Sequence, residues 1–560
     1  MKGSAVIDTH DLERLHPIPT PRHRHATPSG PWPFLDLLDA VPEETIEPRP
    51  QSGKCRHNNE VIQCKACLEG YPQSLFPNWT MSQQQKSLIA GINQTDHRCT
   101  LISVELATKQ DGQPFSTALR INVDQKCYEL ALTTLREMLT RTVKVRAIFV
   151  DGISGCTLKM LGTLYDIEPF FWSSSLGWTP SRFQESLDPV TKSDHITLTL
   201  RFVRKIPKPQ QPSRNHGRRT SNSQDPIIDV HKPLVLDRSA LQPDLLAFHM
   251  IRSQTTSTII SYHSSEKYGS TTADELCERL QLVGRSVYWA KIFEANPDPT
   301  FVVVSMLWYC VYAWDEATQE LYAEICRLEA VIMKTLELTS ITNHLHAISA
   351  HLLYYISLLA DFRKAVCFVR DTPNPAVKDV YQTEDMDNAM KVECDHLLHQ
   401  ISRIEKDCKM QELRLANMMN LGYSRLNIYD SKQTTHLTEA SLRDSKAMKQ
   451  IAYLTMVFLP ATFTTAVFSM NVDEINPGSA PHLWHYFVTA LPLTLFTMWL
   501  VGVMQLPFIA EQKSAIEGTG EQRKTVNPYK WSRLWWPIIL LKTSLTDEAE
   551  NKRLRGLEYQ

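Results

Sequence analysis

Charged residues are missing from two long stretches near the C-terminal end of the chain. No Asp, Glu, Lys or Arg occurs between Lys449 and Asp473, and none occurs between Glu474 and Glu511. A helix that crosses a bilayer needs about 20 mostly apolar residues, whereas helices of soluble proteins usually carry a charge every turn or two. The absence of charge therefore predicts two membrane-spanning helices within residues 451–504, and it argues against a buried hairpin of a soluble core.

Several signatures of other protein classes are also absent. The chain has no glycine-rich phosphate loop, no H-E-x-x-H motif and no nucleophile elbow, so we do not expect an enzyme or an organic cofactor. Its net charge of −2 gives no reason to expect a nucleic-acid partner. The first 24 residues contain Asp8, Asp11 and Glu13 and no apolar run, unlike a secretory signal or an organellar transit peptide. We therefore expect the plasma membrane rather than an organelle.

Lysine and arginine are absent from the connection between the two apolar runs, residues 471–485, and are present on both outer sides. The flanking basic residues are Arg443, Lys446 and Lys449 before the first run and Lys513, Arg523 and Lys524 after the second. Positive charge marks the cytoplasmic side, so both termini are predicted to be cytoplasmic. The connection is a short acidic loop carrying Asp473 and Glu474 on the far side of the membrane.

Residues 1–99 have little that could fill a core, and we interpret them as a loose, disordered tail. The tail contains a cysteine and histidine cluster made of Cys55, His57, Cys64 and Cys67. These ligand types, with the closing C-x-x-C spacing, suit a tetrahedral zinc site. Reduced, unliganded thiols in a loop are the alternative, and they agree with the chain's twelve singly scattered cysteines, which indicate a reducing compartment.

Residues 100–300 are typical of a cytosolic α/β domain. Alternating apolar residues predict strands over Lys144–Asp151 and His195–Val203, and the stretch Leu158–Tyr165 is helix-like. A basic, proline-bearing insert over residues 205–235 is predicted to be a surface loop. Residues 505–560 form a C-terminal tail.

Residues 301–450 are predicted to be helical, and proline is absent from residue 376 to residue 459. From about residue 382 the pattern favours one long stalk helix that continues into the first span. Its apolar residues advance by alternate steps of four and three, which is a coiled-coil heptad seam broken at Gln411. The seam consists of Met390, Cys394, Leu397, Ile401, Ile404, Cys408, Leu415 and Met418.

The order of these parts, together with two local motifs, resembles the CorA-type magnesium and divalent-cation transporters, and most closely their fungal CorA-like branch. Leu459-Pro460-Ala461-Thr462-Phe463 is similar to the proline and threonine of that family's first span. Ser469-Met470-Asn471 is similar to its Gly-Met-Asn signature, with Ser469 in the place of the glycine. A segment of the α/β domain, Leu161–Pro169, is also similar to the family.

The resemblance implies a homopentamer in the lipid bilayer that conducts divalent cations, Mg²⁺ first. Ser469, Met470 and Asn471 would form the selectivity filter, with a ring of five Asn471 amides at the mouth, and Asp473 and Glu474 would concentrate cations there. It also implies that Mg²⁺ bound to the cytosolic domain regulates opening. No organic cofactor is implied.

Hydroxyl and small side chains follow one face of the first predicted span at steps of three and four residues. This hydroxyl stripe consists of Thr455, Leu459, Thr462, Ala466 and Ser469. The hydroxyl groups would line a wet pore, and Leu459 would form a hydrophobic constriction that gates by dewetting. Close packing between helices is the alternative role for such residues.

Two other functions fit the same sequence. Replacement of the motif's glycine by Ser469 suits a membrane-anchored CorA-like sensor or scaffold that does not conduct. A Zn²⁺ or Ni²⁺ transporter is the other alternative.

Overall fold

The computed structural model describes the backbone of residues 64–516, apart from several gaps. In α13, side chains are described only up to Leu500. The gaps are at residues 78, 80, 94–97, 111–112, 189–192, 209–227, 265–269, 297, 335–337, 378–382 and 470–482. The chain divides into two compact units, of which unit 1 ends at Leu426 and unit 2 begins at Asn427. The helix α12 contributes residues to both units, which are described separately below.

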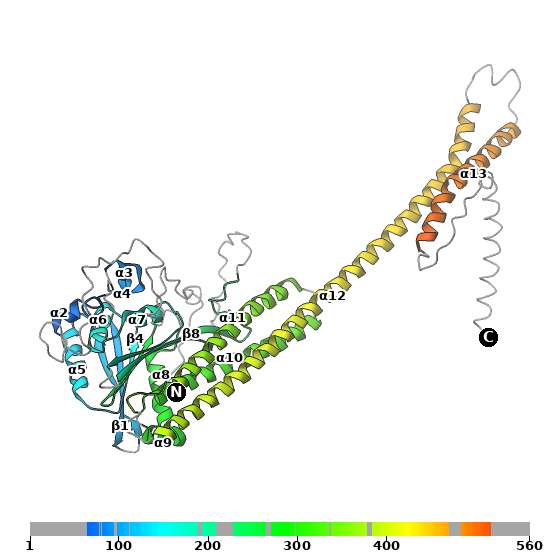
Figure 1. The fold of residues 1–560 in the computed structure, drawn as a ribbon. Coiled ribbons are helices and arrows are strands. Elements are labelled where there is room, and N and C mark those ends of the chain that lie inside the picture. Colours follow the sequence, from blue (N-terminus) through cyan, green and yellow to red (C-terminus); the bar gives the residue numbers. More distant parts are fainter. Residues whose placement is uncertain are drawn as a thin grey trace, which may run out of the picture. The chain divides into compact units, whose positions relative to one another are not determined.

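Unit 1 combines a β-sheet with helices on both faces (Figure 1). The elements that precede α10 are α2 (Lys65–Glu69), α3 (Met81–Lys86), α4 (Leu88–Asn93), β1 (Cys99–Gln110), β2 (Gln113–Phe115), β3 (Leu119–Val123), α5 (Tyr128–Thr140), β4 (Val145–Asp151), α6 (Gly155–Leu164), α7 (Pro169–Leu176), β5 (Ser181–Asp188), β6 (Ser193–Pro207), β7 (Leu234–Val235), β8 (Ser239–Arg252), β9 (Ser257–His263), α8 (Ala273–Gly284) and α9 (Val287–Ala295). The helices that follow are α10 (Thr300–Lys334), α11 (Leu338–Asp371), α12 (Thr383–Phe468) and α13 (Leu483–Ile516).

In the described residues, nine strands form one mixed sheet. Its main path runs β2-β1-β4-β9-β8-β6-β5, while β3 also pairs with β1 and β7 with β8. The pair β4 and β9 is parallel, and the other pairs are antiparallel. The strands predicted from alternation, at residues 144–151 and 195–203, are the inner strand β4 and the long strand β6.

The sheet is buried on both faces, and β4 shows why. Its residues Val145, Ala147 and Phe149 belong to the core under α8–α12, whereas Ile148 and Val150 belong to the core under α2–α7. Successive side chains of a strand point to opposite faces, so a strand covered on both sides is mostly apolar, and the one buried charge of β4, Arg146, is paired with Glu105 of β1. Unit 1 is therefore a three-layer sandwich of helices, sheet and helices.

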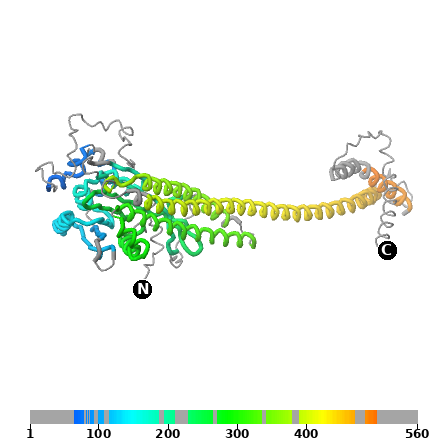
Figure 2. The backbone as a smooth tube through the Cα atoms, turned by 60° about the horizontal axis from the view of Figure 1, so that its bottom comes forward, coloured from blue at the N-terminus to red at the C-terminus, as the bar shows by residue number. Residues whose placement is uncertain are grey.

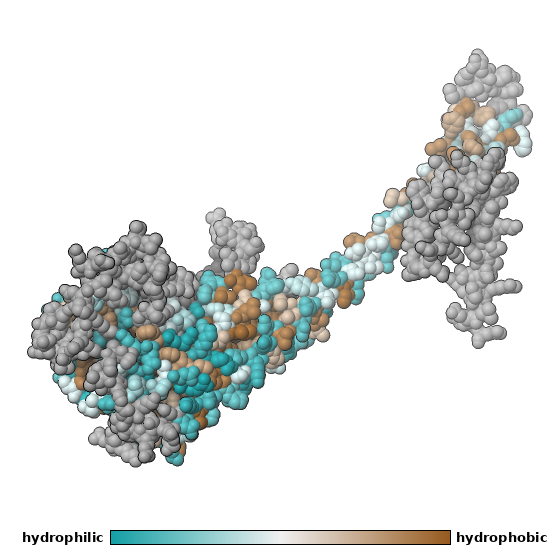
Figure 3. All heavy atoms as spheres, viewed as in Figure 1, coloured by the Kyte–Doolittle hydropathy of each residue, from teal (hydrophilic) through white to brown (hydrophobic). Residues whose placement is uncertain are grey.

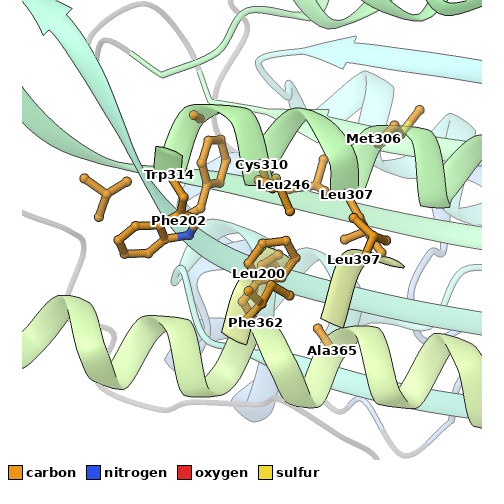
Figure 4. Close-up of a cluster of buried hydrophobic side chains, with 14 of the residues drawn as sticks. Leu200, Phe202, Leu246, Met306, Leu307, Cys310, Trp314, Phe362, Ala365 and Leu397 are labelled. Atoms are coloured by element: carbon orange, nitrogen blue, oxygen red, sulfur yellow. The ribbon is translucent and has the colours of Figure 1, made fainter. Parts of the chain in front are cut away.

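The core on the α10–α12 side is shown in Figure 4, where side chains of β6 and β8 meet those of α10, α11 and α12. Phe202 of β6 lies beside Trp314 of α10, and Leu200 of β6 lies beside Phe362 of α11. Leu397 of α12 lies near Leu307 of α10, and all of these residues are buried. The three long helices lie side by side here in both backbone views (Figures 1 and 2). The first part of α12 is thus an integral part of the core of unit 1.

A buried ion pair joins the sheet to the turn after α11. Arg252 at the end of β8 donates through Nε to Asp194 of β6 at 2.8 Å, and a second guanidinium nitrogen contacts the same carboxylate. The guanidinium also donates to the carbonyl oxygen of Thr372 at 3.0 Å. Both charged side chains are at most 1% exposed, so each depends on the other for compensation of its charge.

Part of the segment expected to be a loose tail is folded. Residues 65–93 contain α2, α3 and α4, and Tyr71 packs so closely on Gly162 of α6 that a Cβ atom there would lie 2.2 Å from the ring. The Tyr71 hydroxyl donates to the carbonyl oxygen of Ile167 at 2.6 Å. Leu68 of α2, together with Tyr71 and Trp79 of the connection between α2 and α3, is buried in the same core as α6 and α7. Local composition did not reveal this burial.

The predicted heptad seam is buried within unit 1. Every seam residue from Met390 to Met418 is at most 9% exposed, and all belong to the core with α10 and α11. Gln411, the expected break, is also buried, and its Nε2 donates to the carbonyl oxygen of Thr318 on α10 at 3.0 Å. The seam therefore packs on helices of the same chain, and α12 continues without a break through the polar stretch 431–435.

Candidate functional site

The end of α12 and the start of α13 pack against each other in unit 2. Pro460 and Thr464 of α12 and Ala490 of α13 are buried, and the Tyr486 hydroxyl of α13 donates to the carbonyl oxygen of Ala461 at 3.4 Å. Small side chains at such a contact let two helices approach closely. The α12–α13 contact thus shows which side of α12 faces α13.

The α12 helix continues through Pro460 although proline lacks an N–H group and removes one helical hydrogen bond. Threonines follow it directly. Thr464 donates its hydroxyl to the carbonyl oxygens of Pro460 and Ala461, at 3.1 and 2.9 Å, and Thr462 donates to that of Phe458 at 2.9 Å. These bonds occupy carbonyl groups around the proline within the helix.

The hydroxyl stripe lies on the side of α12 that α13 does not cover. All five of its residues are exposed in the chain, and Leu459 is 67% exposed. At about 100° per residue, Thr464 lies roughly 200° around the helix from Thr462, so the α12–α13 contact and the hydroxyl stripe are on opposite faces of α12. Packing against α13 therefore accounts for Thr464, and it does not account for the stripe.

The hydroxyl groups of the stripe donate into their own helix. Thr455 donates to the carbonyl oxygen of Ala452 at 2.8 Å, and Ser469 donates to that of Ala466 at 2.7 Å. A hydroxyl group has one proton to donate and two lone pairs that accept. With the proton directed at the helix, the oxygen atoms of the stripe present acceptor capacity to whatever covers this face.

The remaining predicted filter and mouth residues cannot be placed against this stripe. Met470, Asn471, Asp473 and Glu474 lie outside the described residues. Ser469 is described, and it is exposed directly after the last residue of α12. The filter and the acidic mouth therefore stay predictions.

Half of the candidate zinc cluster is described. Cys64 precedes α2 and Cys67 lies in it, with their sulfur atoms 3.8 Å apart. Cys55 and His57 lie outside the described residues, and within the described part of the chain no three His, Cys, Asp or Glu side chains gather as a metal site would require. The zinc site stays a prediction.

One described helical stretch, Asn388–Phe468 of α12, is long and apolar enough to cross a membrane by length and composition, which alone is weak evidence. Its C-terminal part is the first predicted span, and hydrophobic residues gather on its surface in Figure 3. The second predicted span coincides with α13, which has no Asp, Glu, Lys or Arg before Glu511.

Part of the chain matches one family model. Residues 278–505 match the model of the family described as CorA-like Mg²⁺ transporter protein. The matched segment begins in α8 and ends in α13, so it includes both the hydroxyl stripe and the α12–α13 contact. None of the curated proteins is significantly similar to the chain in sequence.

Three solved structures resemble the chain weakly. The CorA magnesium transporter from Methanocaldococcus jannaschii has a TM-score of 0.35 at 11% identity, over 71% of this chain and 96% of its own. The full-length CmaX protein has a TM-score of 0.34 at 13% identity, over 73% and 98%. The ZntB cytoplasmic domain from Vibrio parahaemolyticus has a TM-score of 0.32 at 8% identity, over 60% and 98%. Because these scores are low, they carry no argument about the family or the function of this chain.

Proposed function

Starting from the match of residues 278–505 to the model of the CorA-like Mg²⁺ transporter family, we propose that the protein is a membrane channel for divalent cations, with Mg²⁺ as its main substrate. The family consists of transporters, so the expectation that the chain is not an enzyme is confirmed. We place two spans in the plasma membrane with both termini in the cytoplasm, and five copies around one pore.

The hydroxyl stripe is the observation that carries this proposal. In a single chain, α13 covers the opposite face of α12 and leaves the stripe exposed. A symmetric ring of first spans would turn this face toward a common axis, where the oxygen atoms of Thr455, Thr462 and Ser469 would be stacked at successive depths.

The chemistry of Mg²⁺ suits such a pore. Mg²⁺ gives up its octahedral shell of water reluctantly, and the waters of that shell direct their hydrogen atoms outward. Hydroxyl oxygen atoms that have already donated to the helix can accept these hydrogen atoms. The pore would therefore conduct a hydrated ion without replacing its first shell.

Selection and gating are assigned to particular residues. Five Asn471 amides would accept hydrogen bonds from the hydrated ion at the mouth, beside Met470 and Ser469, and Asp473 and Glu474 would raise the local cation concentration. Leu459 would close the pore by dewetting. Mg²⁺ bound to unit 1 would favour the closed state, because a ligand shifts an equilibrium toward the state that it binds more tightly.

The direct test is uptake by proteoliposomes that contain the full chain, with Mg²⁺, Zn²⁺ and Ni²⁺ compared under one gradient. We expect Mg²⁺ flux that Asn471→Ala abolishes or makes unselective. A variant that transports Mg²⁺ at the original rate and selectivity would exclude the filter assignment.

Two threonines of the same helix provide a matched pair for the stripe. Thr462→Val removes an exposed hydroxyl from the proposed pore face, and we expect Mg²⁺ flux to fall about ten-fold, which corresponds to about 1.4 kcal/mol. Thr464→Val makes the same chemical change in the α12–α13 contact, and we expect flux to change less. Equal effects of the two substitutions would contradict a pore at the stripe.

A non-conducting sensor or scaffold is the second candidate, and Ser469 favours it. The serine adds a side chain where the family motif has glycine, so five copies would narrow the mouth. Intact pentamers that conduct none of the three ions would establish this alternative, and restored flux in Ser469→Gly would assign the block to this residue. Higher flux of Zn²⁺ or Ni²⁺ than of Mg²⁺ would instead make the protein a transporter of those ions.

A further inference from the structure

Unit 1 contains a groove of about 640 Å³ that the transport proposal does not use. It is lined by residues of α8, α9, α10 and the first part of α12. Binding sites for small molecules usually have volumes of about 300–1,000 Å³, mostly apolar walls and a few fixed polar groups. The groove therefore has the size of a ligand site.

Aromatic side chains form much of its wall. Tyr288 and Trp289 come from α9, and Trp308, Tyr309 and Tyr312 come from α10. Trp308 and Tyr312 pack with their ring centroids 5.8 Å apart. Tyr288 and Tyr312 are more than half exposed, so the aromatic wall extends to the open side of the groove.

One carboxylate, Glu393 of α12, lies in this aromatic setting. Its side chain is 5% exposed, and it accepts a hydrogen bond from the Tyr288 hydroxyl. This bond raises the pKa of Tyr288 to about 12, so the phenol stays a neutral donor. The groove thus combines aromatic faces with a fixed, buried acidic group.

The charge of Glu393 is poorly compensated by the protein. Among the ion pairs of the described residues, its single partner is His396, whose Nδ1 lies 3.9 Å away and whose side chain is 59% exposed. A buried carboxylate without a close Lys or Arg is costly. A cation entering the groove would supply the missing compensation.

Arg279, the guanidinium of the groove wall, does not take this role. It pairs with Glu275 at 2.8 Å and lies over the ring of Tyr309, 4.8 Å from the centroid. Its charge is therefore already matched by another carboxylate. Its position on Tyr309 also shows that the aromatic wall accepts a cation on its face.

We propose that this groove binds an organic cation, an ammonium group on a small aliphatic body, with Glu393 as the counter-ion and the aromatic rings of α9 and α10 as the cage. Aromatic faces attract weakly hydrated ammonium groups, and apolar walls bury the aliphatic part. A bare divalent metal ion would need several oxygen ligands, and no group of three acidic or histidine side chains is present in the described part of the chain. The site is separate from the hydroxyl stripe.

The probes are choline and its neutral isostere 3,3-dimethylbutan-1-ol, which share one shape and differ in charge. Calorimetric titration of the full chain in detergent, without an ion gradient, is expected to give millimolar or tighter binding of choline. The isostere is expected to bind about ten-fold more weakly or more. Equal binding of the two probes, or no binding of choline, spermidine or tetramethylammonium at millimolar concentration, overturns the proposal.

Two substitutions with matched controls locate the site. Glu393→Gln keeps the size and the acceptor for Tyr288 and is expected to weaken choline binding about ten-fold. Glu412→Gln on the same helix, outside the groove, is expected to leave it unchanged. Tyr312→Leu, at an exposed position, is expected to weaken binding several-fold, whereas Tyr322→Leu elsewhere on α10 is not. Unchanged binding in both groove variants places the cation elsewhere and refutes the assignment.

These measurements do not depend on conduction. A chain that binds choline and conducts no metal ion supports the groove and contradicts the channel. A chain that conducts Mg²⁺ and binds no ammonium ion does the reverse.

Discussion

The two parts of α12, before and after Leu426, place similar residues in different surroundings. From Met390 to Met418 the apolar side chains of the seam are buried against α10 and α11. Beyond the boundary, Leu437, Met448 and Leu459 are each between 67% and 71% exposed in the chain. Large exposed apolar surfaces usually contact another protein or a membrane. The first part of α12 is therefore stabilised by its own chain, whereas the second, under the proposed function, would be covered by lipid or by other copies.

The comparison is tested most strongly at the buried ion pair of unit 1. Arg252→Met leaves Asp194 buried without its partner, and we expect a loss of about 3–5 kcal/mol in the free energy of unfolding of unit 1. Chemical denaturation of the full chain in detergent, followed by tryptophan fluorescence, measures it. The double variant Asp194→Leu with Arg252→Met should recover part of the loss, because no isolated charge remains.

An exposed pair on the same unit is the control for that experiment. Arg403 and Asp315 are 2.7 Å apart, with side chains 45% and 29% exposed. Arg403→Met is expected to cost less than about 1 kcal/mol. If both single substitutions cost the same, burial is not what makes the Arg252 pair important.

Two leucines of α12 compare its two parts directly. Leu397→Ala opens a cavity in the core of unit 1 and is expected to cost about 2–5 kcal/mol of unfolding free energy. Leu459→Ala, on the exposed stripe, is expected to change stability by about 0.5 kcal/mol or less and to raise ion flux by widening the constriction. Both variants are measured by denaturation and by proteoliposome flux. A Leu397→Ala variant that changes flux and leaves stability unchanged would contradict the difference between the two parts of α12.

Acid is expected to destabilise unit 1 through buried histidines. Burial lowers the pKa of His249 from 6.5 to about 3 and that of His263 to about 4. The unfolded chain then binds more protons than the folded chain, so their contribution is fully present above pH 6.5 and is lost as the pH falls below it.

Between pH 8 and pH 5 the expected loss is about 2 kcal/mol for each histidine. Denaturation midpoints across this range measure it. His249→Gln should make the pH dependence shallower, because the amide does not titrate. The amide can also replace the contact of the ring with Thr197, whose Oγ1 lies 2.9 Å from Nδ1. A flat pH dependence in the original chain would contradict neutral buried histidines.

Patterns with a short period could be predicted from the sequence, because each reports the surroundings of one element. The strand pattern of β4 and the steps of the heptad seam follow from local spacing, and the structure buries their apolar residues. The hydroxyl stripe also follows from local spacing, and its role as a pore lining stays a prediction. Whether a face meets its own chain or another copy is not local information. The seam predicted as a coiled coil packs within the chain for this reason.

The features that the sequence did not reveal depend on distant partners. Tyr71 finds its place through Gly162 and Ile167, about 90 residues away, so the folded helices α2–α4 were missed. Glu393 resembles any acidic residue beside a seam until α8, α9 and α10 surround it. The filter residues Met470 and Asn471 lie outside the described residues, and their roles depend on the motif and on the proposed experiments.

Gln411 restricts how α12 can move. Its hydrogen bond to the Thr318 carbonyl lies inside an apolar interface, and a slide of α12 by one helical turn, about 5.4 Å, would leave the buried side-chain amide of Gln411 without this partner. The displacement with the lower energetic cost is therefore a tilt in which α10 and α12 move together as a rigid pair, without sliding or rotating relative to each other. A signal that begins in unit 1 would reach the later turns of α12 as a change of angle.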